Sequence, residues 1–469
     1  MGVFTIRLKD FILIFQIINI QEGKVIFLDS EALTKIQSII LIAVIAVAAI
    51  GGAVYVLFIV PDQSTDTIKI GVLADLDGLM GKDVMKAAVL AAEQLNAEGG
   101  ILGKQVEVIG EDSDEESGLD SSIINAALVR LLTVDDVDFV IGTADGAPGL
   151  MIEDVMAEHK KIFLSYVTAT EEIIQRVNDD YDKYKYFFKY YPANSTQLNI
   201  AHADELVQAR ELTGFNKVGI IAADSPFLEE IREDLEYRLP EVHGFDLVYE
   251  GVYPAFETFD FSSYFAAAEA AGVEMLIPFV PFDNGLAFVK EYSDRQSPML
   301  IFGGILSAAM DMDSWEQTDG KCKYMTVLMP PVTPGIPFTS KTLEFREAYI
   351  DRWNEIPVHI PTAAYDIVRF ILPDAIERAG TIETDAVIDA LEETDIETVL
   401  AKRFAFTPSH DVLYGEGMLT DPDDFGHPVV LMQWQENGEL VPIYPKWLRE
   451  ETESSYIYPD WPGPWDNIN

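Results

Sequence analysis

Three short polar loops each follow a strand-like segment, and their residues could bind a small ligand. These loops span residues 75–80, 143–148 and 166–170. In the second loop, Pro148 is a favoured first-turn residue of a helix, so the backbone amides of Gly146 and Ala147 would attract an anion such as a ligand carboxylate. Asp145 beside them would oppose a carboxylate and favour an amine or another cation. The loop therefore offers contacts to a small polar molecule.

The positions of these loops support a role in ligand binding. In open α/β sheets, ligands lie beyond the C-terminal ends of the strands. The first loop carries Asp77 there, and the third carries Thr168 and Thr170. The alternative for each loop is an ordinary connection between a strand and a helix.

Motifs for catalysis and for metal binding do not match this sequence. There is no G-x-S-x-G elbow, no P-loop and no G-x-G-x-x-G that opens a helix after a strand. The six histidines are scattered without ligand spacing, and the single cysteine, Cys322, excludes a disulfide framework. The acidic segment 111–116 lacks the glycine spacing and the terminal glutamate of a calcium loop, which favours a solvated turn. We therefore expect no enzyme, no cofactor and no metal site.

The elements around the first loop show how such loops are positioned. Ile68, Ile70 and Val72 alternate with other residues, which predicts a strand. Residues 82–97 have a helical period, and the glycine pair 99–100 ends the helix because glycine tolerates a left-handed backbone. A second strand pattern follows at residues 105–109. The segment is a β-α-β unit.

The same alternation continues along the chain. Further strand patterns lie at residues 137–141, 162–165, 217–222, 246–250, 275–280 and 299–302, and a final strand pair is expected within residues 415–434. Helical patterns separate most of these strands, including a long one at residues 362–379. Such alternation predicts parallel sheets with helices on both faces. At 469 residues, the chain exceeds the size at which one core keeps growing, so we expect two lobes.

The net charge of −47 constrains the partners. Residues 1–60 contain four basic and four acidic side chains, so the whole excess lies in residues 61–469. A domain of this charge is repelled by nucleic acid and by anionic lipid. Solubility in an ion-rich exterior is the favoured explanation, and a preference for cationic ligands is the alternative.

The segment 39–60 predicts a membrane anchor. It holds 22 uncharged residues, enough to cross about 30 Å of hydrocarbon. A cleaved signal has a shorter apolar core; small residues at 46–48 and 51–53 leave cleavage open, but apolar residues continue beyond them. Lys35 before the segment and Asp62 after it favour a cytoplasmic N-terminus and a large domain outside the membrane.

Six motifs occur in a fixed order. They are IKIGVLADLDG (68–78), NAEGGILGK (96–104), VDFVIGT (137–143), KIFLSYVTAT (161–170), KVGIIAAD (217–224) and AYDIVRFILPDAIERAG (364–380). Together they resemble the branched-chain amino-acid (Leu/Ile/Val)-binding protein family, the type I periplasmic solute-binding proteins of ABC transporters. The resemblance implies an α/β fold of two doubly wound parallel-sheet lobes joined by a hinge. It also implies capture of a small polar solute for an ABC permease.

The resemblance implies roles for residues in the first lobe. Relatives use the second loop to grip the ligand carboxylate, and Gly146 stands where they carry a serine hydroxyl. The third loop resembles the family's S-x-x-A-T turn with one residue inserted. Thr170 then matches the family's threonine, with Thr168 as its neighbour.

Roles in the second lobe follow in the same way. Relatives place an aromatic residue after the strand that corresponds to residues 275–280, and Phe282 is the nearest candidate. They place an acid on the strand end that corresponds to residues 302–305, where this chain has Gly303 and Gly304 instead. Asp283 in the adjacent loop could compensate. These departures leave the identity of the solute open, with an amino acid or amide-like compound favoured.

The sequence thus predicts a membrane-anchored extracytoplasmic solute-binding protein. The expected order is a leader (1–38), the anchor (39–60), a tether (61–67), the first lobe (68–190), the second lobe (191–325), a return to the first lobe (326–400), final strands with a crossover (401–443) and an aromatic tail (444–469). A ligand-sensing ectodomain on the same fold is the alternative. We expect the tail's aromatic residues to pack on a lobe rather than to stack on a sugar.

Overall fold

A computed structural model describes most of residues 67–468. It leaves out residues 115–119, 144–145, 169, 191–194, 256, 282–283, 311–312, 330–331, 333–334, 358, 414–423 and 425–429. The predicted leader and the anchor at 39–60 also lie outside the described residues. Within the part that is described, no helix is both long enough and apolar enough to span a bilayer.

The first sheet contains five parallel strands in the order β2-β1-β3-β4-β5. They are β1 (Ile68–Ala74), β2 (Val106–Asp112), β3 (Phe139–Thr143), β4 (Ile162–Val167) and β5 (Phe187–Lys189). The helices between them are α3 (Leu79–Glu98), α4 (Ser121–Thr133), α5 (Gly146–His159), α6 (Glu171–Asp179) and α7 (Tyr181–Tyr184). We call this sheet, with the helices that cover it, the first lobe.

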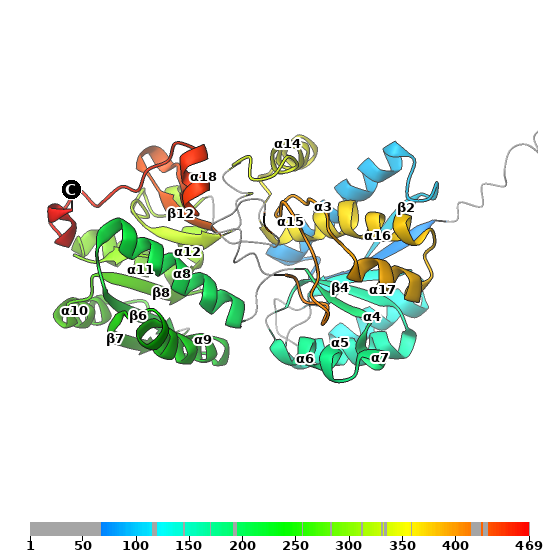
Figure 1. Ribbon diagram of the computed structural model, residues 1–469, viewed down its shortest axis with the longest axis horizontal. Coiled ribbons are helices and arrows are strands. Elements are labelled where there is room, and N and C mark those ends of the chain that lie inside the picture. Colours follow the sequence, from blue (N-terminus) through cyan, green and yellow to red (C-terminus); the bar gives the residue numbers. More distant parts are fainter. Residues whose placement is uncertain are drawn as a thin grey trace, which may run out of the picture. The chain divides into compact units, whose positions relative to one another are not determined.

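Helices cover both faces of the first sheet, as predicted. One face packs on α3 and on later helices, which are α14 (Thr342–Trp353), α15 (His359–Asp366), α16 (Leu372–Ala379) and α17 (Thr384–Glu392). The other face packs on α4, α5 and α6 through buried residues such as Leu131 and Ile152. Figure 1 shows α3 and α16 on one side of this sheet and α4 and α5 on the other. A parallel sheet buried on both faces explains its continuous apolar strands.

The second lobe has two sheets with one core. Its parallel strands are β6 (Lys217–Ala223), β7 (Asp246–Tyr253), β8 (Met275–Val280), β9 (Leu300–Ile301) and β10 (Ile305–Leu306), in the order β10-β8-β6-β7 with β9 also on β8. Its larger helices are α8 (Ser195–Thr213), α9 (Pro226–Tyr237), α10 (Ser262–Ala271) and α11 (Gly285–Arg295), with short helices α12 (Ser307–Met310) and α13 (Ser314–Gln317). An antiparallel sheet follows, with β11 (Thr326–Met329), β12 (Val430–Trp434) and β13 (Leu440–Tyr444) in that order. Val327 and Met432 share the core of the parallel strands.

The β-α-β unit at the start of the first lobe forms as predicted. Gly99 ends α3 with φ +113°, and its N–H bonds back to the Asn96 carbonyl at 3.2 Å. The Asn96 side chain then holds the next strand, because it accepts from the Val106 N–H at 2.7 Å and donates to the Val106 carbonyl at 2.8 Å. A Cβ on Gly100 would lie 1.8 Å from the Lys104 carbonyl oxygen. The tight reversal therefore requires glycine.

Two predicted elements differ in detail. The long helix predicted over residues 362–379 is interrupted by a π-helical turn at Ile367–Ile371, just before Pro373. Proline lacks the N–H that a regular helix interior needs, and a wider turn accommodates this. The final strand pair was predicted within residues 415–434, and most of that range lies outside the described residues; its last part forms β12, which pairs with β11 and β13.

The aromatic tail packs on the second lobe, as expected. Trp461 and Trp465 belong to its core, and the Trp461 Nε1–H donates to the Ser297 carbonyl at 2.9 Å. Tyr456 stacks on Phe302 with ring centroids 5.6 Å apart. The tail, which includes α18 (Lys446–Glu451), is the red segment of Figure 1. Its indole rings are thus used in packing.

Candidate functional site

Two predicted site residues meet at the C-terminal edge of the first sheet. Gly146 opens α5 after β3, and Thr170 precedes α6 after β4. The Gly146 N–H donates to the Thr170 Oγ1 at 2.6 Å. This bond joins the second and third loops, so the two can present one surface. Ala147 is exposed in the first turn of α5, where helical amides lack intrahelical acceptors.

The inserted residue in the third loop is absorbed as a bulge. The pairing of β3 with β4 passes from Gly142 opposite Ser165 to Thr143 opposite Val167, and it skips Tyr166. Thr168, which follows, is fully buried, and its Oγ1 lies 2.5 Å from the Ser165 Oγ. Its hydroxyl therefore supports the loop from inside, whereas Thr170 stays half-buried at the edge.

The two acids of the first loop have different environments. The Asp75 carboxylate is buried, and its Oδ1 accepts from the Gly78 N–H at 2.8 Å. Asp77 is exposed. The loop is thus a turn closed by Asp75, and Asp77 is the carboxylate that it presents to solvent. The other predicted site residues, Asp145, Phe282 and Asp283, lie outside the described residues.

A buried polar row on α8 is a feature that the sequence analysis missed. Asn199, His202 and Glu205 follow one another at three-residue spacing, and none is more than 1% exposed. His202 Nδ1 lies 3.7 Å from Glu205 Oε1, and the imidazole edge meets Phe279 with ring centroids 5.1 Å apart. Among the described residues, Asn199 Oδ1, both His202 ring nitrogens and both Glu205 oxygens lack a hydrogen bond of good geometry. Buried polar atoms of this kind are rare in native proteins.

The Glu205 side chain ends at the glycine pair between β9 and β10. A Cβ on Gly303 would lie 1.6 Å from Glu205 Oε1, and Gly303 has φ +54°. Burial raises the pKa of Glu205, and the neighbouring His202 ring and Gly304 amide oppose that rise. The strand end near Gly303 and Gly304 carries no acidic residue of its own. The Glu205 carboxylate from α8 therefore occupies the space beside it. The sequence did contain a signal for this buried row. Asn199, His202 and Glu205 recur at three-residue spacing on a helix face that also buries Leu206.

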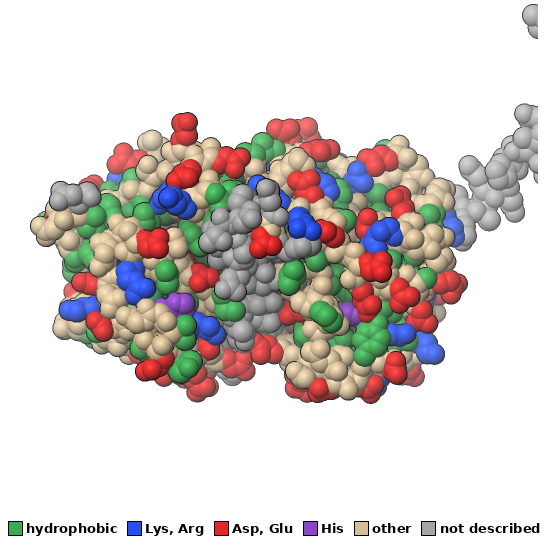
Figure 2. All heavy atoms as spheres, viewed as in Figure 1, with side chains coloured by type: hydrophobic (Ala, Val, Ile, Leu, Met, Phe, Trp, Pro, Cys, Tyr) green, Lys and Arg blue, Asp and Glu red, His purple; other side chains and the backbone are tan. Residues whose placement is uncertain are grey.

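Charge on the face of the molecule shown in Figure 2 is dispersed rather than gathered in one patch. Figure 2 shows Asp and Glu side chains scattered over the viewed face, with Lys and Arg between them. Ion pairs among the described residues include that of Arg352 with Glu93, whose Nε and Oε2 lie 2.9 Å apart. The dispersed pattern supports the solubility explanation of the acidic excess on that face.

Comparison with known proteins identifies the class. Residues 67–439 match the periplasmic binding protein family, and the chain belongs to that family. The Leu/Ile/Val-binding protein homolog 7 of Brucella suis is 22% identical over 392 residues, which cover 81% of this chain and 91% of that protein. The predicted family resemblance is confirmed.

Solved structures show the same fold. A putative branched-chain amino acid ABC transporter protein from Silicibacter pomeroyi superposes with a TM-score of 0.72 at 18% identity, covering 85% of this chain and 100% of that one. A branched-chain amino acid substrate-binding protein from Streptococcus pneumoniae, solved with isoleucine, gives 0.60 at 18% identity, covering 80% and 100%. The fold is therefore the α/β type I periplasmic-binding-protein fold.

Proposed function

We propose that this protein captures a small polar solute outside the cytoplasm and delivers it to an ABC permease, without catalysing a reaction on it. The observation that carries the proposal is the hydrogen bond from the Gly146 N–H to the Thr170 Oγ1 at 2.6 Å. It fixes two loops at the carboxyl ends of adjacent parallel strands, which is where α/β sheets bind ligands. Family membership supports the same conclusion.

The proposed solute is an amino acid or an amide-like compound. The first-turn amides of α5, including that of Ala147, suit a carboxylate. A carboxyl group such as Asp77 suits an amine, and Asp145, Phe282 and Asp283 are further contacts that we propose from the sequence. The Streptococcus pneumoniae protein of the same fold was solved with isoleucine, which carries both groups.

The proposed mechanism is closure of the two lobes on the solute. The chain would cross between the lobes near residue 190, again after β11 ends at Met329 in the second lobe, and a third time before β12 begins at Val430 in that lobe. A solute that contacts both lobes favours the closed state by its differential affinity for that state. Glu205 would act from behind the edge of the second lobe, by holding the Gly303 and Gly304 backbone in place.

The proposed location is the outer face of a membrane. The uncharged segment 39–60 would anchor the protein, with the lobes outside. The acidic lobes would dock on basic loops of the permease. Uptake by the reconstituted permease should then depend on the lobes; uptake that is unchanged without them would contradict this part of the proposal.

A ligand screen tests the proposal directly. The full-length protein is screened by thermal shift against amino acids, amides, polyamines and sugars, because a ligand that binds only the native state raises Tm. We expect amino acids or amides to raise Tm and the Thr170→Val variant to reduce the shift. Stabilisation by sugars alone would overturn the proposed solute class.

A further inference from the structure

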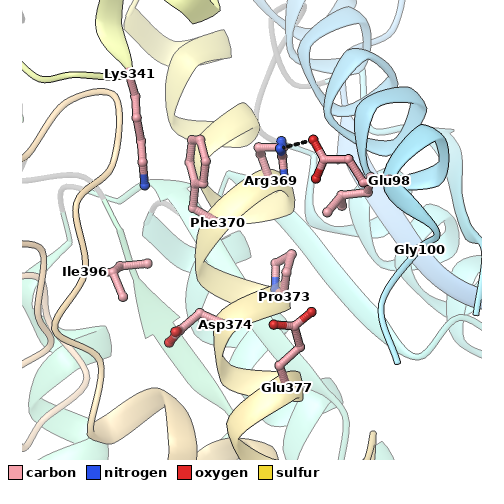
Figure 3. Close-up of a pocket in the computed structure, with 10 residues that line it drawn as sticks. Glu98, Gly100, Lys341, Arg369, Phe370, Pro373, Asp374, Glu377 and Ile396 are labelled. Atoms are coloured by element: carbon pink, nitrogen blue, oxygen red, sulfur yellow. Dashed lines mark hydrogen bonds and ion pairs between the residues drawn. The ribbon is translucent and has the colours of Figure 1, made fainter. Parts of the chain in front are cut away.

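Two charged regions of the first lobe differ in how their charges are balanced. One is a pocket of about 380 Å³, drawn in Figure 3, where Arg369 donates to Glu98 at 2.6 Å. Asp374 in the same lining pairs with Arg378 at 2.8 Å. The other region is the junction of α5, α6 and α7, where three acidic side chains share two basic ones. It lies behind the proposed site, because α5 and α6 begin at the two loops of that site.

The five side chains of this junction are connected through Arg176 and Asp154. On α6, Arg176 Nη1 lies 3.6 Å from Glu153 Oε2 and 3.5 Å from Asp154 Oδ2. Arg176 Nε lies 3.8 Å from Glu172 Oε1. On α7, Lys183 Nζ lies 2.9 Å from Asp154 Oδ1. Three carboxylates and two cations would leave one negative charge in excess if all five groups were ionised.

The other groups that face α5 do not balance this excess. Strands β3 and β4 contain no Lys, Arg, Asp or Glu. The one charged residue within α4 is Arg130, which pairs with Glu111 at 2.5 Å. The Tyr184 hydroxyl on α7 donates to Asp154 Oδ1 at 3.0 Å and is neutral. One of the three acids must therefore hold a proton for the junction to be balanced.

Glu153 is the acid best placed to hold that proton. Its side chain is fully buried, and neither carboxyl oxygen has a hydrogen bond among the described residues, whereas Asp154 and Glu172 are exposed. Burial of an unpaired carboxylate disfavours its charged form. Burial raises the pKa of Glu153 to about 8; Arg176 opposes this rise, and the charges of Asp154 and Glu172 add to it. At neutral pH the junction is therefore balanced, with Glu153 uncharged.

Helix α5 connects the Glu153 carboxyl to the proposed site. Seven residues separate Gly146 from Glu153, so Glu153 lies about 10 Å behind the first turn of the helix. Helix α6 is held to the same segment, because Arg176 Nη1 donates to the Leu150 carbonyl at 3.2 Å. A buried negative charge at this distance opposes the attraction of the first-turn amides for an anion.

We propose that Glu153 is a positioning residue of the solute site, whose proton keeps the first turn of α5 attractive to a solute carboxylate. This inference rests on the proposed function, which assigns that turn to the solute carboxylate. Loss of the proton at alkaline pH leaves the junction with an unbalanced negative charge behind the site. Solute affinity then falls roughly threefold to tenfold.

Solute affinity at two pH values tests the inference. L-leucine is titrated calorimetrically into the full-length wild type and Glu153→Gln at pH 6.5 and pH 9. The glutamine amide imitates the protonated acid, and comparison of the two proteins at each pH removes the effect of pH on leucine itself. Relative to Glu153→Gln, the wild-type Kd should rise roughly threefold to tenfold at pH 9. Glu158→Gln removes an exposed acid from the same helix and should follow the wild type.

A second measurement needs no solute. A carboxyl whose pKa is raised in the folded state makes the fold lose stability as pH rises from about 4.5 to about 8. Between pH 6.5 and pH 9, the unfolding equilibrium constant of the wild type in urea should therefore rise roughly tenfold to thirtyfold relative to that of Glu153→Gln. Glu153→Met, which is also neutral and similar in size, serves if the glutamine variant does not fold.

The outcomes separate this inference from the proposed function. Leucine binding with the same pH profile in wild type and Glu153→Gln would overturn the role of Glu153 and leave the proposed site intact. Absence of leucine binding in both proteins would refute the proposed solute, and with it the coupling to Glu153. Stability curves that stay parallel from pH 6.5 to pH 9 would show that Glu153 is already ionised at neutral pH, and would overturn the inference whichever solute binds.

Discussion

The Glu205 carboxylate occupies the space that a side chain on Gly303 would need. A Cβ at that position would lie 1.6 Å from Glu205 Oε1, closer than any non-bonded contact allows. Gly303 also donates its N–H to the Thr326 Oγ1 at 2.9 Å, so the backbone there is held from the other side. Helix α8 and the β9–β10 connection can therefore pack together in this way only with glycine at position 303.

Gly303→Ala should destabilise the protein. The new methyl group displaces the Glu205 carboxylate, and φ +54° adds backbone strain for a residue with a Cβ. We expect a loss of about 2–4 kcal/mol in the free energy of unfolding, measured by urea denaturation.

A glycine in open space serves as the control for strain alone. Gly244 lies in the same lobe with φ +70°, and nothing lies within 4 Å of a Cβ built there. Gly244→Ala should cost about 1 kcal/mol. The double variant Glu205→Ala/Gly303→Ala should recover part of the loss, because the two changes act on one contact. Strictly additive losses would show that the two residues do not compete for space.

Thr170→Val should weaken solute binding more than it weakens the fold. Valine keeps the shape of the side chain but leaves the Gly146 N–H without its acceptor. The ordered arrangement of the two loops then loses about 1–2 kcal/mol of stabilising free energy. We expect a solute Kd raised roughly fivefold to thirtyfold in titration calorimetry. Thr170→Ser keeps the hydroxyl and should bind nearly as well as the wild type. Equal affinity of both variants for the solute would show that this hydrogen bond does not contribute to binding.

The predictions from sequence succeeded where the evidence was local. The β-α-β unit follows from alternation in β1 and from the left-handed end of α3 at Gly99. The insertion in the third loop was recognised, but its consequence, a bulge at Tyr166 that buries Thr168, depends on the pairing of β3 with β4.

Contacts between distant segments could not be read from the sequence. Glu205 reaches Gly303 only because α8 packs behind the β9–β10 connection; the spacing of the polar residues on α8 could signal their burial but not this partner. Phe282 and Asp283 remain predictions from family resemblance.

Trp461→Ala should lower the free energy of unfolding of the second lobe. The indole is only 7% exposed, and its Nε1–H donates to the Ser297 carbonyl at 2.9 Å. Loss of a buried aromatic ring costs about 3–5 kcal/mol. Trp461→Phe keeps most of the packing and should lose only about 1–2 kcal/mol with the hydrogen bond. A Trp461→Ala variant with wild-type urea resistance would show that the tail contributes no stability.

Asp366→Asn should change how stability depends on pH. Asp366 is fully buried and accepts from the Tyr190 hydroxyl at 2.5 Å and from the Val399 N–H at 2.8 Å. Burial raises its pKa to about 6, above the ordinary value of 3.8. A carboxyl that binds its proton more tightly when folded makes the free energy of unfolding fall as pH rises from about 4 to 6. Above pH 6 this contribution is constant and unfavourable, by about 3 kcal/mol.

The measurement is urea unfolding of wild type and Asp366→Asn between pH 4.5 and pH 7.5. Asparagine cannot ionise, so the variant lacks this contribution, and the wild type should gain stability relative to it as the pH is lowered. Asp366 joins Tyr190, at the end of the first pass through the first lobe, to Val399, so this titration acts at the junction between the two segments. Parallel stability curves for the two proteins would show that Asp366 has an ordinary pKa and that this junction does not respond to pH.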